Sequence, residues 1–156
     1  MKSRFFALII AGMVSGTIPD AAYPQDMTKT QLQRMYSGYL QSEGFSPAVD
    51  SDGDVSFKYQ GGNYYISVDE KDQAFFQLVL PNIWKIESHS ERNDAALAAS
   101  LLSERKKIVK VYVTDWDNVM ISAELLLPSP SDFSLFFYRL LELIANTQRE
   151  FYEKMR

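Results

Sequence analysis

The sequence predicts an α+β domain whose elements run helix, three strands, helix, two strands, helix. Three observations lead to this class. Apolar residues make up 46% of the 156 residues, which is enough for a sizeable core. Two pairs of β-rich segments alternate apolar and polar residues around short polar turns, which is typical of antiparallel hairpins. Three other segments repeat apolar residues at helical spacing, and no repeat interrupts the order, so residues 28–156 are predicted to form a single domain.

The first helix is predicted to begin at a capping box. Thr28 and Gln31 have the spacing of that motif, and apolar residues follow them at helical intervals. Gly44 is placed to end the helix, because glycine tolerates the left-handed backbone that a helix end requires, and Phe45 is expected to fold back onto the helix.

Three strands are predicted next. Residues 55–59 and 64–68 alternate on either side of a Gly-Gly pair, which can supply the positive φ of a tight hairpin turn. Residues 75–80 form a third strand, which Pro81 is expected to interrupt. Residues 83–86 either extend that strand or begin a crossing loop.

The second half of the chain contains two helices and another hairpin. Residues 88–91 can cap a helix whose body, residues 94–105, is rich in alanine and leucine. Residues 107–114 and 118–127 are β-rich and are joined by a polar turn, so they are predicted to pair.

The last helix is predicted to be the longest. Ser129 is expected to be its N-cap and Pro130 its first residue. An apolar stripe at helical spacing continues almost to the end of the chain. If the helix runs unbroken from Pro130 to Met155, it is roughly 39 Å long at 1.5 Å per residue.

The N-terminus has the pattern of a secretory signal peptide. Lys2 and Arg4 precede an apolar run over residues 5–14, which is too short to span a bilayer. Residues 1–22 are therefore excluded from the fold, with residues 23–27 as a linker. The cleavage point stays open, and so does the alternative of an apolar anchor that remains in place. We expect export to the periplasm or the medium, with no transmembrane segment after the signal is removed.

Composition excludes several classes of site. The chain has no cysteine, so it has no cysteine-linked lipid anchor, no disulfide, no thiolate nucleophile and no cysteine–zinc site. The formal net charge is −4, and it becomes −5 when residues 1–22 are removed with Lys2, Arg4 and Asp20. A nucleic-acid partner is not expected, because such proteins place clustered Lys and Arg against phosphates.

The segment DSDGD at residues 50–54 resembles the start of a calcium loop. Asp50, Asp52 and Asp54 occupy the first, third and fifth positions of an EF-hand. The sixth position is Val55 instead of glycine, and the twelfth is Gly61 instead of glutamate, so the residues that close the loop around the ion are missing. The segment is interpreted as a turn before a strand, and no metal site is predicted.

His89 is the only histidine of the chain, so any Ser-His-Asp arrangement would have to include it. No G-x-S-x-G motif occurs, and serines adjacent to a histidine in sequence have no geometric claim to be its nucleophile. His89 is interpreted as a solvated residue near a helix start. No catalytic residue and no cofactor are predicted.

Three stretches carry a resemblance to a known family: DGDVSFKYQGGNYYISV, LPNIWKI and KVYVTDWDNVMISAELLL. With the alanine-rich helix and the closing aromatic helix, they resemble the YbjN family over roughly residues 28–155. Its fold is similar to that of type III secretion chaperones, the Tir chaperone-like fold. The resemblance implies a curved antiparallel sheet of about five strands backed by helices, often dimeric and without a cofactor. Secretion chaperones of this fold bind extended segments of partner proteins on apolar patches.

Aromatic residues are the best candidates for a binding surface, because large apolar side chains on a sheet surface indicate a contact. Tyr65, Phe75 and Val79 are expected on the opposite strand faces from their apolar neighbours, and Trp84 lies near a strand end. These four residues are the predicted protein-binding site. The alternative is that both faces of the sheet are covered within the monomer.

A homodimer interface is predicted at the middle helix. Ala95, Ala96 and Ala99 are small enough to let another element approach closely, although an internal helix–sheet contact would need the same residues. The predicted function is therefore an exported, non-catalytic module that binds a protein or peptide. The alternatives are a metal-dependent hydrolase and a calcium-binding envelope protein.

Overall fold

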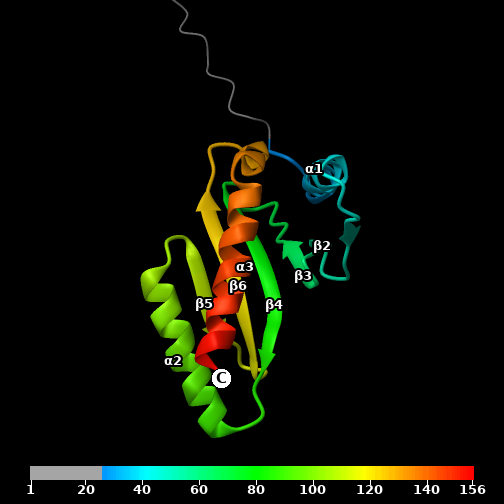
Figure 1. The fold of residues 1–156 in the computed structure, drawn as a ribbon. Coiled ribbons are helices and arrows are strands. Elements are labelled where there is room, and N and C mark those ends of the chain that lie inside the picture. The colour runs from blue at the N-terminus through cyan, green and yellow to red at the C-terminus, as the bar shows by residue number, and fades with distance from the viewer. Residues whose placement is uncertain (1–25) are drawn as a thin grey trace, which may run out of the picture.

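The computed structural model describes residues 26–156, which form one antiparallel sheet with helices on one side (Figure 1). The predicted signal peptide lies outside the described residues. The strand order across the sheet is β1-β2-β3-β4-β6-β5. Along the chain the elements are α1 (Lys29–Ser42), β1 (Ala48–Val49), β2 (Val55–Tyr59), β3 (Gly62–Ile66), β4 (Phe75–Lys85), α2 (His89–Arg105), β5 (Val109–Val113), β6 (Asn118–Leu126), the 3-10 helix η1 (Pro130–Leu135) and α3 (Phe137–Lys154).

The predicted α+β class and element order are confirmed, with two additions. The sheet has six strands because a two-residue strand, β1, pairs with β2. The second addition is η1, which precedes α3. No helix of residues 26–156 is both long and apolar enough to span a bilayer.

Helix α1 begins and ends where the local sequence motifs place it. The Thr28 side chain accepts from the Gln31 backbone N–H, and the Gln31 side chain accepts from the Thr28 N–H, so both halves of the capping box form. Gly44 has φ +85°, and the Phe45 N–H donates to the Leu40 carbonyl at 2.9 Å. The capping box satisfies two backbone donors that the helix start would otherwise leave unpaired.

The turn of the β2–β3 hairpin lies one residue earlier than the Gly-Gly pair suggested. Tyr59 pairs with Gly62, so the two turn residues are Gln60 and Gly61, with φ of 47° and 83°. These positive values are typical of the two-residue turns that match strand twist. Gly62 belongs to β3, and a Cβ there would come within 2.9 Å of the Tyr64 ring. Gly62 is therefore required because it leaves room for the Tyr64 ring, and not because of a turn conformation.

Strand β4 continues through Pro81, so the predicted interruption is wrong. β4 pairs with β6 on both sides of Pro81, and the register shifts between Leu80 and Trp84. Asn82 in this irregular stretch has φ 53°. A bulge tolerates proline because its residues need not donate to the ladder.

The final helix is not continuous, which corrects the prediction of one helix from Pro130 to Met155. Ser129 and Pro130 begin the 3-10 helix η1, and α3 starts only at Phe137. Within η1 the Ser134 hydroxyl donates to the Ser131 carbonyl. Serine and aspartate side chains compete for backbone groups in this way, which favours short turns over a long α-helix. α3 is then about 27 Å long at 1.5 Å per residue.

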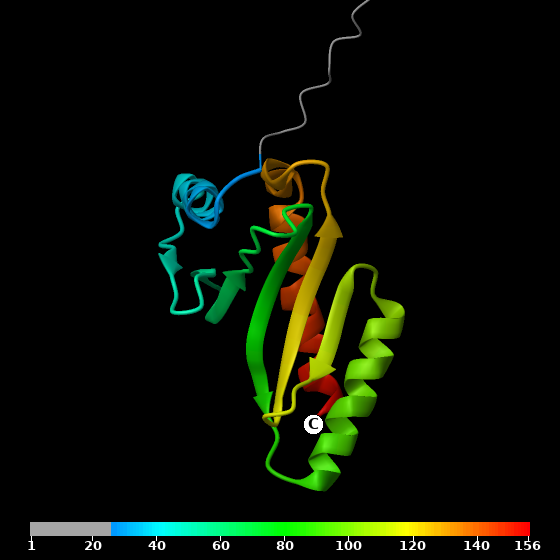
Figure 2. The ribbon, with the colours of Figure 1, turned by 180° about the vertical axis from the view of Figure 1, so that it is seen from behind.

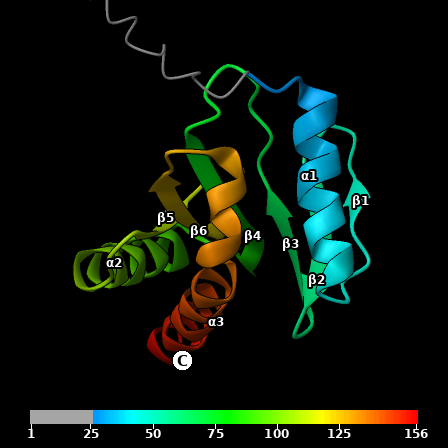
Figure 3. The ribbon, with the colours of Figure 1, turned by 90° about the horizontal axis from the view of Figure 1, so that it is seen from above.

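The core lies between the sheet and the three α-helices. Phe137 at the start of α3 is fully buried, and its ring lies within 6.2 Å of the rings of Tyr39, Phe45, Phe57 and Phe133. Figure 3 shows α1 beside β2 and β3, at the far end of the sheet from α2. Seen from behind, β4 and β6 lie in front of α3, and no helix of residues 26–156 crosses them (Figure 2). We call this the helix-free face.

The outer edge of β5 is occupied at its centre by a side chain of α2. The Ser103 hydroxyl accepts from the Val111 N–H at 2.9 Å and donates to the Val111 carbonyl at 3.2 Å. At the other end of the sheet, β1 pairs with β2 only at Val55 and Ser56. The two edges of the sheet are therefore unlike.

Candidate functional site

The helix-free face brings side chains from four strands into one row. Tyr65 of β3 pairs with Val79 of β4, Val79 with Ser122 of β6, and Ser122 with Lys110 of β5. Directly paired residues of neighbouring strands project to the same face of a sheet. The four residues therefore lie on the same side. Val79 and Ser122 are buried in the middle of the row, while Tyr65 and Lys110 flank them. Two predicted binding residues, Tyr65 and Val79, are thus direct neighbours.

Two tyrosines give the face its aromatic character. Tyr65 and Tyr112 are each partly buried, and Met120, which pairs with Tyr112, is buried beside them. Burial raises the pKa of Tyr65 to about 12, with a smaller contribution from Tyr112. Burial is also the main cause that raises the pKa of Tyr112, followed by the charge of Glu124. Both hydroxyls therefore stay protonated near neutral pH, and each can donate a hydrogen bond.

A carboxylate network lies next to the row. Glu124 accepts from Gln77 Nε2 at 3.0 Å and from the Ser122 hydroxyl at 2.9 Å, both on Oε1. Its other oxygen is 2.7 Å from the Lys110 ammonium. Burial alone would raise the pKa of Glu124, but the hydrogen bonds from Lys110, Gln77 and Ser122 outweigh it and lower the pKa. The Glu124 side chain is only 15% exposed, so the network fixes a largely buried carboxylate beside the tyrosines.

Phe75 lies on the helix-free face but at its end. It pairs with Leu126, whose side chain is 78% exposed. An exposed leucine beside an aromatic ring extends the apolar surface beyond the tyrosines.

Trp84 does not belong to this surface, which corrects its grouping with Tyr65, Phe75 and Val79. Its ring lies 6.2 Å from that of Phe151 and 6.0 Å from that of Tyr152, both in α3 on the helical side of the sheet. The indole N–H donates to Glu91 Oε1 at 2.8 Å, and Glu91 Oε2 accepts from the Glu87 N–H. Both hydrogen bonds lower the pKa of Glu91, and the bond from the Glu87 N–H has the larger effect. Trp84 therefore anchors the start of α2.

The predicted dimer residues divide between two environments. Ala95 and Ala99 are buried on the side of α2 that packs inside the domain, with Ala98 and Leu102. Only Ala96 is exposed. The structure thus uses Ala95 and Ala99 for an internal contact, which was the alternative reading of these residues.

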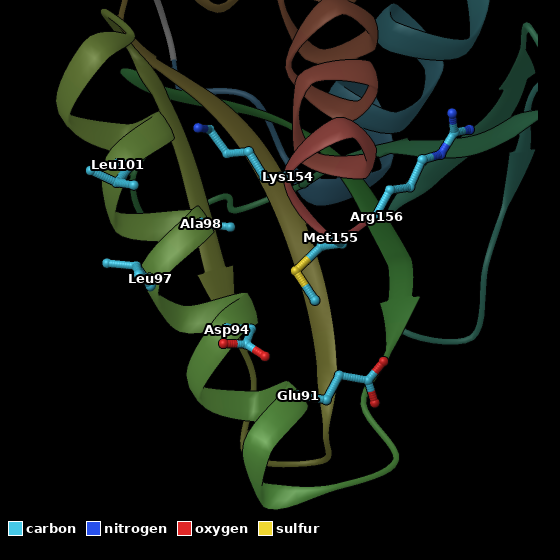
Figure 4. A pocket seen from close by; sticks show the side chains of 8 residues that line it. All are labelled: Glu91, Asp94, Leu97, Ala98, Leu101, Lys154, Met155 and Arg156. Carbon is cyan, nitrogen blue, oxygen red and sulfur yellow. The ribbon is translucent and has the colours of Figure 1, made fainter.

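A groove runs between α2 and the end of α3 (Figure 4). Its volume is about 480 Å³, and its lining includes Leu97, Leu101 and Met155. Glu91 and Asp94 line it near the start of α2. Lys154 lies at the level of Leu101 (Figure 4). The groove therefore has acidic groups at one end, a basic group at the other and apolar side chains between them.

The Asp50–Asp54 segment forms a turn, as interpreted from the sequence. Asp50 Oδ1 accepts from the N–H groups of Asp52, Gly53 and Asp54 at 2.9–3.0 Å. Asp54 Oδ1 accepts from the Val68 N–H. Lys29 Nζ of α1 donates to the Asp52 carbonyl, so the turn also fastens α1 to the sheet.

His89 is the first residue of α2, next to the N-cap Ser88. It is exposed, as the sequence suggested for a residue near a helix start. Within residues 26–156, no three His, Cys, Asp or Glu side chains gather in a way that could hold a metal ion.

Sequence reasoning missed most of the helix-free face. Tyr112, Met120, Ser122 and Glu124 were not singled out, because β6 lies beside β4 only through a pairing that spans the whole of α2. The alternation of residues 119–124 does indicate which of their side chains share a face. It carried no information about which strand lies next to them.

The arrangement of strands and helices matches a known structure. No family model and no curated protein matches the chain. A crystal structure of YbjN from E. coli, described as a candidate transcription regulator, aligns with a TM-score of 0.57 and 14% sequence identity. The alignment covers 74% of this chain and 87% of that one. Residues 26–156 therefore have a YbjN-like fold, as the sequence resemblance implied.

Proposed function

We propose that this domain is a non-catalytic module that binds a protein or peptide on its helix-free face. The observation that carries the proposal is the row Tyr65–Val79–Ser122–Lys110, which crosses four strands on a side that no helix of residues 26–156 covers. Antiparallel sheets commonly turn one face to water, but such a face usually carries polar side chains. Here the face also carries two tyrosines, a methionine and the Phe75–Leu126 pair.

The chemistry of the face defines what its partner offers. Tyrosines are enriched at protein interfaces because they combine a large apolar ring with one polar group. The partner is expected to place apolar side chains against Tyr65 and Tyr112 and hydrogen-bond acceptors near their hydroxyls. The Glu124 carboxylate already has hydrogen-bond and ion-pair partners within the domain. We therefore expect it to orient a partner without pairing with a positive charge of that partner.

Site-specific photocrosslinking tests this proposal. A photoreactive phenylalanine analogue replaces Tyr65 or Tyr112 in cells that produce the chain, and adducts are identified by mass spectrometry. Tyr138 is the matched control, because it is a 45% exposed tyrosine on α3. Discrete protein adducts from the first two positions, and none from the control, are expected. The same adducts from all three positions, or none from Tyr65 and Tyr112, would refute the assignment of this face.

We also propose that the domain acts after export. The support is Lys2 and Arg4 ahead of the apolar run at residues 5–14. Mass spectrometry of the intact chain recovered from periplasm and medium checks this. A chain that keeps residues 1–22 and stays in the cytoplasm would contradict it.

The YbjN structure has been described as a candidate transcription regulator, and for this chain we propose that any regulatory role operates through a protein partner. The formal net charge of −4 supports this, because direct binding to DNA depends on neutralising phosphates with clustered basic residues. A salt-dependent shift of duplex DNA in a mobility assay would contradict it.

A further inference from the structure

Strand β2 is longer than the strand that covers its outer edge. β1 pairs with it only at Val55 and Ser56, so the edge is open over the residues that follow. Tyr59 and Gly62 flank a two-residue turn and are therefore a hydrogen-bonded pair with β3. Bonded and non-bonded pairs alternate along an antiparallel ladder. Lys58 therefore directs its N–H and its C=O away from β3, towards the open edge.

The bonds on the β1 side agree with this assignment. The Asp50 N–H donates to the Asp54 carbonyl at 3.0 Å, and Asp54 lies four residues before Lys58, so both face the same edge. Among residues 26–156, no hydrogen bond reaches the Lys58 N–H or C=O from that side. A free donor and a free acceptor on a strand edge can pair with one more extended segment.

A hollow of about 630 Å³ lies beside this open edge, and we call it the edge hollow. Phe45 and Phe57 line it with rings 5.2 Å apart. Lys58 is the one charged residue in the lining, and it forms no ion pair within residues 26–156. An apolar wall with a single free charge and unpaired backbone groups is typical of a site that recognises a defined chemical group.

The edge hollow is closed at one end. The chain that leads from Gly44 into β1 forms one wall and β2 forms the other, and the two walls meet where Ala48 pairs with Ser56. A segment that enters beside the β2–β3 turn and pairs with Lys58 cannot continue along β2 past that point, because β1 occupies the edge. The end of a chain meets this condition without a bend.

We propose that the edge hollow binds the C-terminus of a partner polypeptide that ends in an apolar residue. The segment runs antiparallel to β2, and its penultimate residue takes both free backbone groups of Lys58. The last residue then lies opposite Phe57, and directly paired residues project to the same face, so its side chain meets Phe57 and Phe45. The terminal carboxylate reaches the closed end, where the Lys58 ammonium supplies the complementary charge.

The charge of the edge hollow distinguishes the two ends of a chain. An N-terminus would bring an ammonium group to a site whose one charged residue is a lysine. Strand addition and capture of a terminal carboxylate are both established modes of peptide recognition. The edge hollow lies beside the outer edge of β2 instead of on the row of Tyr65 and Val79, so this site goes beyond the proposed function and does not depend on it.

The first experiment compares free-acid and amidated peptides by fluorescence polarisation. The chain from residue 23 onward is used, since it contains every helix and strand of the described fold. The probes are short threonine- and valine-rich peptides varied at their last two positions, each made as the free acid and as the C-terminal amide. Free acids that end in an apolar residue are expected to bind, and their amides at least about tenfold more weakly, because hydrogen bonds to charged groups are the stronger ones.

A lysine substitution tests the charge. Lys58→Met keeps an unbranched apolar side chain and should weaken binding of the free acid about twofold to fivefold, since the ammonium is exposed, while it leaves the amide unchanged. Lys85→Met is the matched control, because Lys85 is an exposed lysine at the end of β4 that does not line the edge hollow. It should bind both peptides as the unsubstituted chain does. Circular dichroism verifies that both variants are folded.

Hydrogen exchange locates the bound peptide. The Lys58 amide is free in the isolated chain and should exchange more slowly when the free-acid peptide is added. The Phe57 amide faces β3 in a bonded pair with Tyr64, so it serves as the internal control and should stay protected throughout.

Three results would each overturn the proposal: no free acid that binds better than its amide, equal binding of that acid by Lys58→Met, or unchanged exchange at the Lys58 amide. Peptides that bind equally well as acid and amide would show that the edge accepts internal segments instead of chain ends. Photocrosslinking at Tyr65 and Tyr112 does not involve the edge hollow, so failure of this site is distinguishable from failure of the proposed binding face.

Discussion

Replacing Glu124 with glutamine should destabilise the domain by roughly 2 kcal/mol at neutral pH. The amide can keep its oxygen where Oε1 accepts from Gln77 and Ser122. Its nitrogen then faces the Lys110 ammonium and the ion pair is lost. Lys110 is 61% exposed, so screening holds that pair below about 1 kcal/mol. The two remaining hydrogen bonds change from a charged to a neutral acceptor, which costs about 0.5–1 kcal/mol each.

The cost of Glu124→Gln should depend on pH in one direction. The pKa of Glu124 is lowered in the folded chain, so the unfolded chain takes up the proton first as pH falls. The stability that the carboxylate contributes is therefore complete above the ordinary glutamate pKa of about 4.3 and is lost as pH falls through the lower folded value. Below that value the protonated Glu124 resembles glutamine, and the two proteins should converge in stability.

Urea denaturation of both proteins between neutral pH and about pH 3 measures the difference, with Lys110→Ala as the control that removes only the ion pair. Lys110→Ala should cost less than about 1 kcal/mol and lose its effect in high salt. A difference between parent and Glu124→Gln that stays constant with pH, or that grows as pH falls, would refute the assignment of charge to Glu124.

Three further substitutions test other parts of the fold by the same denaturation. Asp50→Ala removes an acceptor from three backbone N–H groups and should cost about 1–2 kcal/mol, equally with calcium or with chelator; a loss seen only with calcium would mean that the turn is an ion site. Phe137→Ala empties the centre of the aromatic core and should cost about 3–5 kcal/mol, against clearly less for the 41% exposed Phe136→Ala, and equal losses would contradict the packing described. Ser103→Ala leaves the Val111 N–H without its partner and should cost about 1–2 kcal/mol, with faster hydrogen exchange at that amide; unchanged exchange would show that the hydroxyl is not its acceptor.

Local motifs of the sequence predicted the ends of elements well. The Thr28 capping box and the Gly44 helix end depend only on residues within one turn of each other, and both formed as expected. Non-local pairing was not predictable in this way. Strand β4 meets β6 across α2, and neither the register nor the Glu124 network that follows from it can be derived from alternation.

Trp84 shows a different kind of limit. In the irregular stretch, β4 advances by four residues, from Leu80 to Trp84. Its partner β6 advances by only two over the same distance, from Ile121 to Val119. The two extra residues preserve the alternation, so Trp84 shares a face with Leu80. Counting through Pro81 would have placed the indole on the helical side. A proline in a strand usually ends the alternation, so the pattern before Pro81 is not ordinarily extended to residues after it.

The unlike edges of the sheet limit how copies of this chain can grow into larger assemblies. Fibre growth by strand addition needs two free edges per molecule, one to accept a neighbour and one to offer to the next. At β5 the Val111 backbone groups are already bonded to Ser103, so an arriving strand would have to displace part of α2. Strand addition would thus stop after a single neighbour at the β1 side. This hydroxyl, bonded to the residue between Lys110 and Tyr112 of the candidate binding face, therefore protects the protein against polymerisation as well as stabilising it.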